Sequence, residues 1–260
     1  MDAPLAGRVA LVTGVSRRKG IGFAIARRLL ADGASVFVHS FAPHDAEQPW
    51  GADPAGVDAV VDALDAPDRV GHCAADLADP AAPAAVVDAA LARFGALDVV
   101  VANHARSSQQ SLEELTAAEL DTTWAVNARA SLLLVQAFAA RHDDHRPGGR
   151  VVLFTSGQHL APMADELPYA VSKGAIHQMT RSLAAHVARR GITVNCVNPG
   201  PTDTGWATDE LADTVRGAMP FGRWGTPSDV ANLVAFLVSD QGEWITGQVI
   251  DSEGGFRRGA

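Results

Sequence analysis

Residues 8–40 read "RVALVTGVSRRKGIGFAIARRLLADGASVFVHS", and this stretch decides the fold. The apolar runs at 8–13 and 34–40 have the length of buried strands. Between them, apolar residues recur at helical spacing: Ile21, Ala24, Ile25 and Leu29. Gly33 stands where the C-terminus of that helix would favour glycine. The stretch therefore predicts a strand, a helix and a second strand, in that order.

The same rhythm continues along the chain. Further β-rich apolar runs, separated by alanine-rich helical segments, occur at residues 69–75, 97–103, 150–156, 192–198 and 247–252. Strands that helices cover on both faces are nearly continuous apolar runs of this kind. The pattern predicts an α/β protein with a doubly wound parallel sheet of seven strands and helices on both faces. A length of 260 residues with 47% apolar content fits a single domain over residues 1–260.

Composition excludes several classes of protein. The net charge is -9 and the 21 basic residues are scattered, whereas nucleic-acid binders cluster Lys and Arg. The N-terminal stretch lacks the pattern of a secretory signal, and no apolar run reaches the roughly 18 residues of a membrane span. Cys73 and Cys196 are isolated, so the sequence indicates neither a disulfide nor a metal site. We expect a cytoplasmic protein that binds no nucleic acid, membrane or metal.

Two stretches interrupt the alternation of strands and helices. Residues 41–56 and 201–227 are rich in Pro, Gly and Asp, and we expect both to be loops. Each follows a predicted strand, and ligands of doubly wound sheets bind beyond the carboxyl ends of the strands. The two stretches are therefore candidate walls of a binding site.

The first predicted strand runs directly into "TGVSRRKGIG", residues 13–22, and then into the first helix. Gly14, Gly20 and Gly22 allow a tight turn and let backbone N–H groups approach a pyrophosphate at the helix N-terminus. A glycine cluster placed between the first strand and the first helix indicates a dinucleotide-binding loop.

Charge indicates which dinucleotide binds. Sites that prefer NAD place an acidic residue at the end of the second strand, where this chain has Ser40 and Phe41. No carboxylate stands there to repel a 2′-phosphate, and Arg17 and Arg18 could bind one. The sequence thus favours NADP(H) over NAD(H) as the cofactor. The alternative is that these arginines point into solvent, and His44 in the following stretch leaves the 2′ pocket undefined.

Tyr169 is the single tyrosine of the chain and precedes Lys173 by four residues. On a helix these two positions share a face. Because a nearby ammonium favours phenolate, we expect Lys173 to lower the pKa of Tyr169, so that the phenol exchanges a proton near neutral pH. We expect the helix to rest on an apolar stripe formed by Val171, Ala175, Met179, Leu183 and Val187.

Two further polar residues complete a candidate reaction centre. Ser156 ends the fifth predicted strand, and its hydroxyl could hold a carbonyl oxygen that Tyr169 protonates. Asn127 stands in the otherwise apolar helical stretch "WAVNARA". Its amide either serves the reaction centre or is satisfied by backbone groups within the core.

Together these features resemble the short-chain dehydrogenase/reductase family over about residues 7–256, and in particular its 3-oxoacyl-ACP reductase-like members. The family's glycine motif is matched, with two extra residues in the loop, by Thr13, Gly14, Gly20, Ile21 and Gly22. Its Asn-Asn-Ala-Gly motif is kept in part, since Asn103 is present while His104 and Ala105 replace Ala and Gly. Its catalytic tetrad falls on Asn127, Ser156, Tyr169 and Lys173.

The resemblance implies a Rossmann fold and extends the set of cofactor contacts. With the charge argument above, the expected cofactor-binding residues are Gly14, Ser16, Arg17, Arg18, Gly20, Ile21, Gly22, Ser40, Asp76, Leu77, Asn103, Tyr169, Lys173, Pro199, Gly200, Thr202 and Thr204. It also implies roles for the tetrad. Tyr169 would protonate the carbonyl oxygen that Ser156 orients, Lys173 would hold the ribose, and Asn127 would hold a water that links Lys173 to solvent.

The implied function is an NADPH-dependent carbonyl reductase or alcohol dehydrogenase, acting on a 3-oxoacyl thioester or another largely apolar ketone. We expect the substrate pocket to include His159, Leu160, Met163 and Trp206, the last in a lid around residues 201–220. Arg216 is the one basic residue of the lid helix, and its alternative is an exposed helical position. Family members commonly form tetramers, so a homotetramer is expected, with a homodimer as the alternative.

Other functions are open at this point. A catalytically silent NADP(H)-sensing regulator could use the same fold, although the intact tetrad argues against it. An enoyl reductase usually spaces Tyr and Lys more widely than the four positions found here. The same residues serve carbonyl reduction and alcohol oxidation, so both directions are open.

Overall fold

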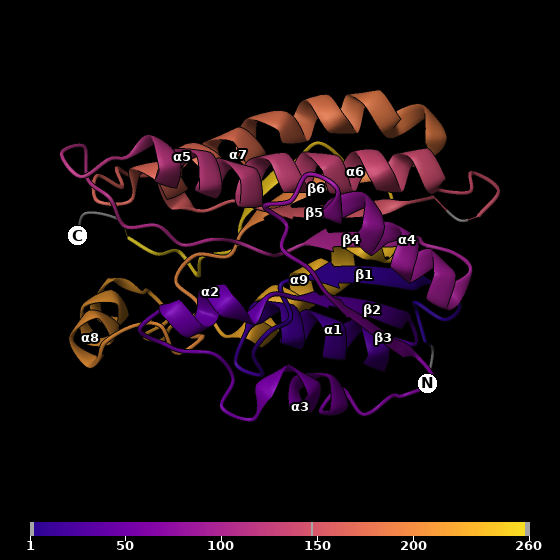
Figure 1. Ribbon diagram of the computed structural model, residues 1–260, viewed down its shortest axis with the longest axis horizontal. Helices are drawn as coiled ribbons and strands as arrows, with labels where there is room; N and C mark the ends of the chain where they lie inside the picture. The colour runs from indigo at the N-terminus through magenta and orange to yellow at the C-terminus, as the bar shows by residue number, and fades with distance from the viewer. Residues whose placement is uncertain (1–2, 147, 258–260) are drawn as a thin grey trace.

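A computed structural model describes residues 3–146 and 148–257, and it has one seven-stranded parallel sheet in the order β3-β2-β1-β4-β5-β6-β7 (Figure 1). The strands are β1(Val9–Thr13), β2(Ser35–Ser40), β3(Val70–Ala74), β4(Val99–Ala102), β5(Arg150–Phe154), β6(Thr193–Asn198) and β7(Val249–Asp251). Each predicted strand is confirmed to within two residues at its ends. The ends of the predicted domain at residues 1–2 and 258–260 lie outside the described residues.

Helices cover both faces of the sheet. One face carries α1(Ile21–Ala31), α3(Gly56–Asp62) and α9(Pro227–Val238), and the other carries α4(Ala82–Phe94), α6(Ala130–Arg141) and α7(Leu167–Val187). Figure 1 shows α1 and α3 toward the bottom of the view and α6 and α7 toward the top. Short 3-10 turns occur at η2(Gly157–His159), η3(Ala188–Arg190) and η4(Asp240–Gly242). The predicted doubly wound fold is confirmed.

Neighbouring residues of each central strand pack into different halves of the core. On β1, Ala10 and Val12 pack with α1 and α9, whereas Leu11 packs with the helices of the opposite face. All three are 0% exposed. Because side chains alternate between the faces of a sheet, a strand covered on both faces must be apolar at every position. This is why the strands are continuous apolar runs in the sequence.

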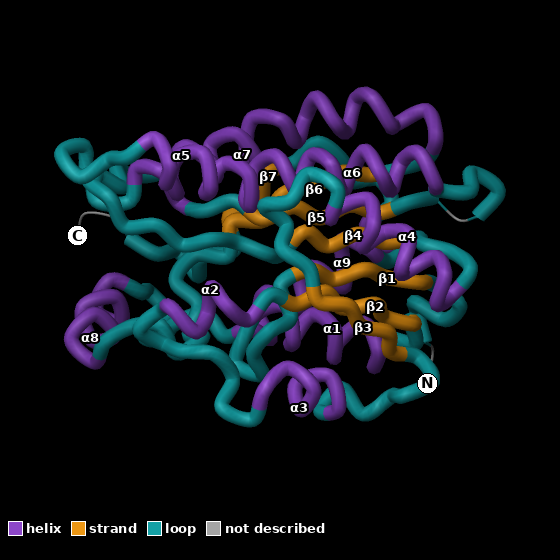
Figure 2. Tube along the Cα trace, viewed as in Figure 1, coloured by secondary structure: helices purple, strands orange, loops and turns teal. Residues whose placement is uncertain are grey.

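The two stretches expected to be loops each contain a helix. Residues 41–56 form α2(Ala42–Glu47), with Pro43 in its first turn. Residues 201–227 include α8(Asp209–Ala218), which the Thr208 side chain caps by accepting from the N–H of Leu211 at 3.3 Å. Figure 2 shows α2 and α8 among the long connections at the end of the sheet away from the N-terminus. The expectation of irregular loops was wrong because Pro, Asp and Thr also start helices.

A single long helical stretch carries Asn127. It comprises α5(Ala117–Trp124), the π-helical turn η1(Ala125–Arg129) and α6, which follow one another without a break. A π-turn inside an α-helix is frequent at functional sites. Here it places Asn127 in the interior, where the residue is 0% exposed.

The buried face of α7 differs from the expected stripe. Val171 is 55% exposed, and the face toward the sheet is formed by Pro168, Ser172, Lys173, Ile176, Thr180, Ala184 and Val187. The expectation holds for Val187, and Met179 and Leu183 are partly buried against the core. It was wrong for Val171, because it assigned the centre of the buried face to the more apolar row of the helix. Lys173 lies in the core instead, only 2% exposed. None of the helices in the described part of the chain combines the length and apolar character of a membrane span.

Candidate active site

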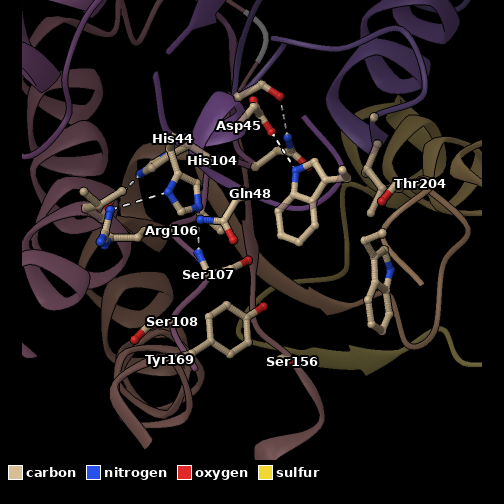
Figure 3. Close-up of a pocket in the computed structure, with 18 of the residues that line it drawn as sticks. His44, Asp45, Gln48, His104, Arg106, Ser107, Ser108, Ser156, Tyr169 and Thr204 are labelled. Carbon is tan, nitrogen blue, oxygen red and sulfur yellow. Dashed lines mark hydrogen bonds between the residues drawn. The ribbon is translucent and has the colours of Figure 1, made fainter. Parts of the chain in front are cut away.

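A cavity of about 1160 Å³ lies at the carboxyl ends of the strands. It exceeds the roughly 300–1000 Å³ of a pocket for one small ligand, so it can hold a dinucleotide and a second molecule. Figure 3 shows side chains around it, with His44 and Arg106 on one side of Tyr169. The predicted site residues that line it are Gly14, Ser16, Arg17, Gly20, Ile21, Asp76, Leu77, Asn103, Ser156, Met163, Tyr169, Pro199, Gly200, Thr204 and Trp206. The others, Arg18, Gly22, Ser40, Asn127, His159, Leu160, Lys173 and Thr202, are not part of its lining.

The glycine loop is packed so tightly that only glycine fits. Gly14 has φ +74°, and a Cβ there would lie 2.8 Å from the Cα of His104. A Cβ on Gly22 would lie 2.6 Å from the carbonyl oxygen of Gly14. The Nδ2 of Asn103 donates to the carbonyls of Thr13 and Gly14 at 3.0 and 3.2 Å, so this side chain holds the loop in shape.

Helix α1 begins directly behind this loop. Its N-cap is Gly20, and no side chain caps the first turn. The N–H groups of an uncapped first turn, with the positive end of the helix dipole, form an anion site. The cradle therefore fits a pyrophosphate.

His104 ties the loop to the helix that carries Asn127. Its Nε2 lies 2.9 Å from the carbonyl oxygen of Val126, and its Nδ1 lies 2.7 Å from the hydroxyl of Thr13. Burial lowers the pKa of His104 to about 3, so the ring is neutral. Since a carbonyl can only accept, Nε2 carries the hydrogen and Nδ1 accepts from the hydroxyl. Histidine at this position links β1 to the π-turn.

The two arginines of the loop point to different places. Arg17 lines the cavity, where its Nε lies 3.2 Å from Oδ1 of Asp45. Arg18 is 43% exposed in its side chain and binds both carboxylate oxygens of Asp53. The carboxylate of Asp45 therefore lies beside the glycine loop, which the sequence did not indicate. Arg18 is partly exposed to solvent, as the alternative prediction had it. Ser40 is buried and bonds to Nε2 of His72 at 2.8 Å.

Tyr169 and Ser156 meet at the cavity (Figure 3). Burial raises the pKa of Tyr169 to about 12, while a hydrogen bond with Ser156 opposes the rise and the nearby Glu166 carboxylate adds to it. The expected lowering by Lys173 was wrong. The ammonium of Lys173 donates to the carbonyl of Phe154 at 3.0 Å, and burial lowers the pKa of Lys173 to about 8. Desolvation dominates for both groups.

The side-chain amide of Asn127 forms hydrogen bonds to other groups of the protein. Its Oδ1 accepts from the N–H of Arg106 at 2.7 Å. Its Nδ2 donates to the carbonyl of Arg106 at 3.0 Å and to Oγ of Ser172 at 2.9 Å. This matches the alternative in which the amide is satisfied within the core. Asn127 thereby fixes the start of the loop that follows β4 against α7.

Two of the four expected substrate residues line the cavity and two do not. Met163 and Trp206 line the cavity, whereas His159 turns to Asp251, with Nε2 3.1 Å from Oδ1, and stacks near His177. Leu160 lies outside the lining and is 44% exposed. Thr202 is buried, with its hydroxyl 3.2 and 3.3 Å from the carbonyls of Pro199 and Gly200. Arg216 takes its exposed alternative, paired with Asp213.

Sequence reasoning missed the polar wall of the cavity. This wall consists of Arg106, Ser107, Ser108, Gln109, Gln110, Glu119 and Glu166. Arg106 binds both carboxylate oxygens of Glu119, at 3.1 and 3.0 Å. The only signal in the sequence was position, because residues 106–110 directly follow the fourth predicted strand.

Comparisons with known proteins identify the family and agree with the fold. A family model described as Enoyl-(Acyl carrier protein) reductase matches residues 14–257. The chain is 42% identical over 257 residues to the uncharacterized oxidoreductase YjdA of Bacillus subtilis, covering 97% of this chain and 98% of that protein. A short chain dehydrogenase from Burkholderia cenocepacia, solved in complex with NADP, superposes with a TM-score of 0.85 at 38% identity, over 97% of this chain and 98% of that one.

The chain belongs to the short-chain dehydrogenase/reductase family. It is therefore an oxidoreductase of that family, whose members act on small molecules. A plant member, the NADPH-dependent aldehyde reductase-like protein of Arabidopsis thaliana chloroplasts, is 34% identical over 261 residues, covering 97% of this chain and 95% of that protein. For this short-chain dehydrogenase/reductase, the sequence resemblance had named the right family.

Proposed function

We propose that the protein is an NADP(H)-dependent carbonyl reductase or alcohol dehydrogenase that acts on an aldehyde, ketone or secondary alcohol. The observation that carries this proposal is the meeting of Tyr169 and Ser156 at the wall of the cavity, with Lys173 buried behind them. A phenol hydrogen-bonded to a second hydroxyl can donate a proton to a carbonyl oxygen placed between them.

The cavity offers a place for each part of a dinucleotide. Residues of the glycine loop and the start of α1 would hold the pyrophosphate. Asp76 and Leu77 would hold the adenine end, and Pro199, Gly200 and Thr204 the nicotinamide end. When bound, the nicotinamide supplies or accepts the hydride.

Arg17 is the group that favours the phosphorylated cofactor. It lies in the cavity wall, next to the loop that would cradle the pyrophosphate. Two relatives support the choice, since the Burkholderia structure contains NADP and the Arabidopsis relative is named for NADPH. NADP(H) is therefore proposed over NAD(H).

In the proposed reduction, Tyr169 gives its proton to the carbonyl oxygen, and Ser156 holds that oxygen in place. Lys173 would hold the ribose hydroxyls, and Asn127 would act by keeping residue 106 and α7 at a fixed separation. In the oxidation of an alcohol, the same phenol takes the proton back.

The proposed substrate has an apolar body. Met163, Trp206, Leu211, Val215 and Trp224 form an apolar wall, largely from the segment 201–220. The polar side chains of residues 106–110 line the same cavity, so part of the substrate would carry hydrogen-bonding groups. A 3-oxoacyl thioester and an aromatic aldehyde both fit this description. We further propose that α8 and its flanking residues act as the lid over this end.

The proposed assembly is a homotetramer, or else a homodimer. The supporting observation is a set of exposed apolar side chains on α5, α6 and α7: Trp124 at 47%, Leu132 at 43% and Val171 at 55%. A second copy packed on these helices would bury them. Light scattering on the purified protein measures the mass directly, and a monomer at assay concentration would contradict the proposal.

The first experiment is oxidation of NADPH and of NADH by the purified protein with an acetoacetyl thioester, a cyclic ketone, a quinone and an aromatic aldehyde. Turnover with one of them, faster with NADPH and lost in Tyr169→Phe, is expected. Binding of NADPH without turnover of any carbonyl, or of secondary alcohols with NADP, would favour the catalytically silent sensor instead.

A further inference from the structure

Asp45 forms an ion pair with Arg17, the residue that would bind the 2′-phosphate of NADP(H). Oδ1 of Asp45 lies 3.2 Å from Nε of Arg17, and the two side chains are only 20% and 16% exposed. The same Oδ1 accepts from the indole N–H of Trp50 at 3.1 Å. The guanidinium of Arg17 lies 5.7 Å from the centre of the Trp50 ring. The carboxylate of Asp45 and the ring of Trp50 thus contact Arg17 in the way that a phosphate and a flat base of a cofactor would.

One further nitrogen of Arg17 is also bound. Its Nη1 donates to the carbonyl oxygen of Thr204 at 3.3 Å. Asp45 and Thr204, both labelled in Figure 3, line the cavity. Arg17 belongs to the same lining. The guanidinium is therefore held inside the cavity and does not extend into solvent.

The segment that carries Asp45 is fastened at two places. Near its start, the N–H of Phe41 donates to Oγ of Ser16 in the glycine loop at 3.0 Å. Further along, Nε2 of His44 accepts from the N–H of Ser107 at 3.1 Å. Residues 41–50 therefore run from the glycine loop to the loop after β4 and form one wall of the cavity. This wall fixes the Asp45 carboxylate next to Arg17.

We propose that Asp45 is an internal competitor for Arg17, which a 2′-phosphate must displace, and that it therefore sets the preference between NADP(H) and NAD(H). The inference rests on the proposed function. Its physical basis is charge, because the Asp45–Arg17 pair is neutral and an incoming phosphate must also leave the carboxylate without its partner. Discrimination thus depends on residue 45 in α2 and not on Ser40, whose hydroxyl is bonded to His72.

Asp45→Asn tests the inference because it keeps the shape of the side chain and removes its charge. Dissociation constants for NADPH and NADH, from nicotinamide fluorescence, and for adenosine 2′,5′-bisphosphate and adenosine 5′-phosphate, from calorimetry, should be measured in parallel. We expect the two 2′-phosphorylated ligands to bind about fivefold to twentyfold more tightly to the variant. The two ligands with a free 2′-hydroxyl should change by less than about twofold.

Asp62→Asn is the matched control. Asp62 is an exposed carboxylate of α3 outside the cavity lining, so this variant should leave all four constants within about twofold of wild type. Weaker NADH binding by Asp45→Asn would show that Asp45 holds ribose hydroxyls, and equal changes for all ligands would show a general effect on the segment. Either result overturns the inference. Failure of the wild-type protein to bind NADPH and NADH would instead overturn the proposed function itself.

Discussion

Lys173 lies under the ring of Tyr169, with its Nζ 5.5 Å from the ring centre, and donates to the carbonyl of Phe154. The pair thus shares one face of α7, as its spacing predicted, but the two groups are not hydrogen-bonded to each other in any contact that the structure records among its described residues. Burial raises the pKa of the phenol to about 12 and lowers that of the ammonium to about 8. At neutral pH the phenol therefore carries its proton and is ready to donate it.

Tyr169→Phe should reduce carbonyl turnover by about 10²–10⁴-fold, because it removes the proton donor while keeping the ring. The dissociation constant for NADPH should stay within about threefold, measured by fluorescence titration. The matched control is Ser182→Ala, which removes an exposed hydroxyl of α7 that lies outside the cavity lining. A Phe variant that keeps most of its activity would exclude Tyr169 as the acid.

Lys173→Met should stabilise the folded protein at pH 7 while it lowers activity. The folded pKa of about 8 lies below the ordinary 10.5, so between these values the unfolded chain binds the extra proton and wild-type stability rises with pH. The variant lacks this rise. Its advantage, about 1–3 kcal/mol at pH 7, should therefore shrink toward pH 10 in urea unfolding.

The exposed Lys19 provides the control for that experiment. Lys19→Met should change the unfolding free energy little at either pH. An advantage of Lys173→Met that is the same at pH 7 and pH 10 would contradict the assignment of the lowered pKa to Lys173.

Glu166→Gln should move the pH profile of the reaction toward lower pH. The carboxylate of Glu166 lines the cavity and raises the pKa of Tyr169, because it disfavours a second negative charge. Without it the phenol loses its proton at lower pH, so the basic limb of carbonyl reduction should fall earlier. Asp165→Asn, one residue away and exposed, is the control, and an unchanged or upward-shifted limb in Glu166→Gln would refute the coupling.

Gly14→Ala should weaken NADPH binding by at least about tenfold, because the new Cβ would lie 2.8 Å from backbone of His104 at φ +74°. Gly51→Ala is the control, since Gly51 has φ +66° but nothing within 4 Å of its Cβ. That variant carries the strain of positive φ without the collision. Equal losses of NADPH affinity in the two variants would show that tight packing of the loop is not required.

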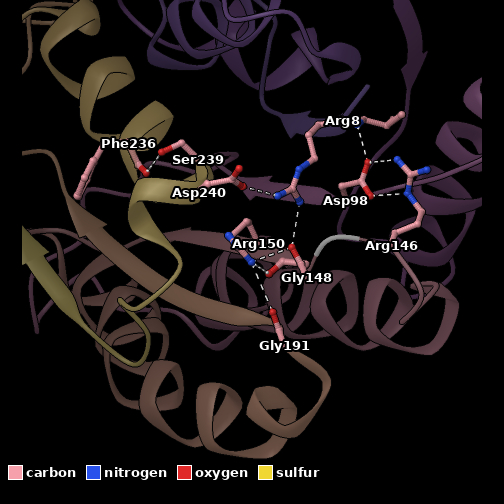
Figure 4. A network of polar contacts seen from close by, with 11 residues as sticks. Arg8, Asp98, Arg146, Gly148, Arg150, Gly191, Phe236, Ser239 and Asp240 are labelled. Carbon is pink, nitrogen blue, oxygen red and sulfur yellow. Dashed lines mark hydrogen bonds and ion pairs between the residues drawn. The ribbon is translucent and has the colours of Figure 1, made fainter. Parts of the chain in front are cut away.

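Asp98→Ala should destabilise the protein by about 2–4 kcal/mol in urea unfolding. Asp98 is 0% exposed, accepts from the N–H of Val9 at 2.8 Å and binds Arg146 through both oxygens, as Figure 4 shows. Its loss leaves a buried N–H without an acceptor at the start of β1. The control is Asp144→Ala, which breaks an exposed pair with Arg190 and should cost less than about 0.5 kcal/mol.

The strands could be predicted because a strand that is buried on both faces needs an apolar residue at every position, and such a run is visible in the sequence. The pair Tyr169 and Lys173 could be predicted for a similar reason, since helical spacing fixes which positions share a face. The ion pair between Arg17 and Asp45 could not be predicted. Asp45 lies 28 positions further along the chain, in a segment that the sequence indicates is a loop.

The polar wall and the pKa shifts were hidden for physical reasons as well. Arg106 lies at the cavity because Asn127 binds its backbone, a contact between residues 21 positions apart. The pKa of Tyr169 depends on how much water reaches it, and desolvation is a property of the packed core. The sequence spacing indicated that a positive charge lies near the phenol of Tyr169. It could not indicate the larger effect of burial on the pKa of each group.

The π-turn at η1(Ala125–Arg129) holds one residue more than a regular helical turn. Because the wider turn takes up this residue, deleting it would leave a regular α-helix in which α6 keeps its orientation. Leu134 and Phe138 of α6 would therefore stay in the core, where they are now buried. The change would be confined to the turn that places Asn127. During evolution this helix could thus have gained or lost the extra residue without repacking the core, and only the position of residue 127 would have changed.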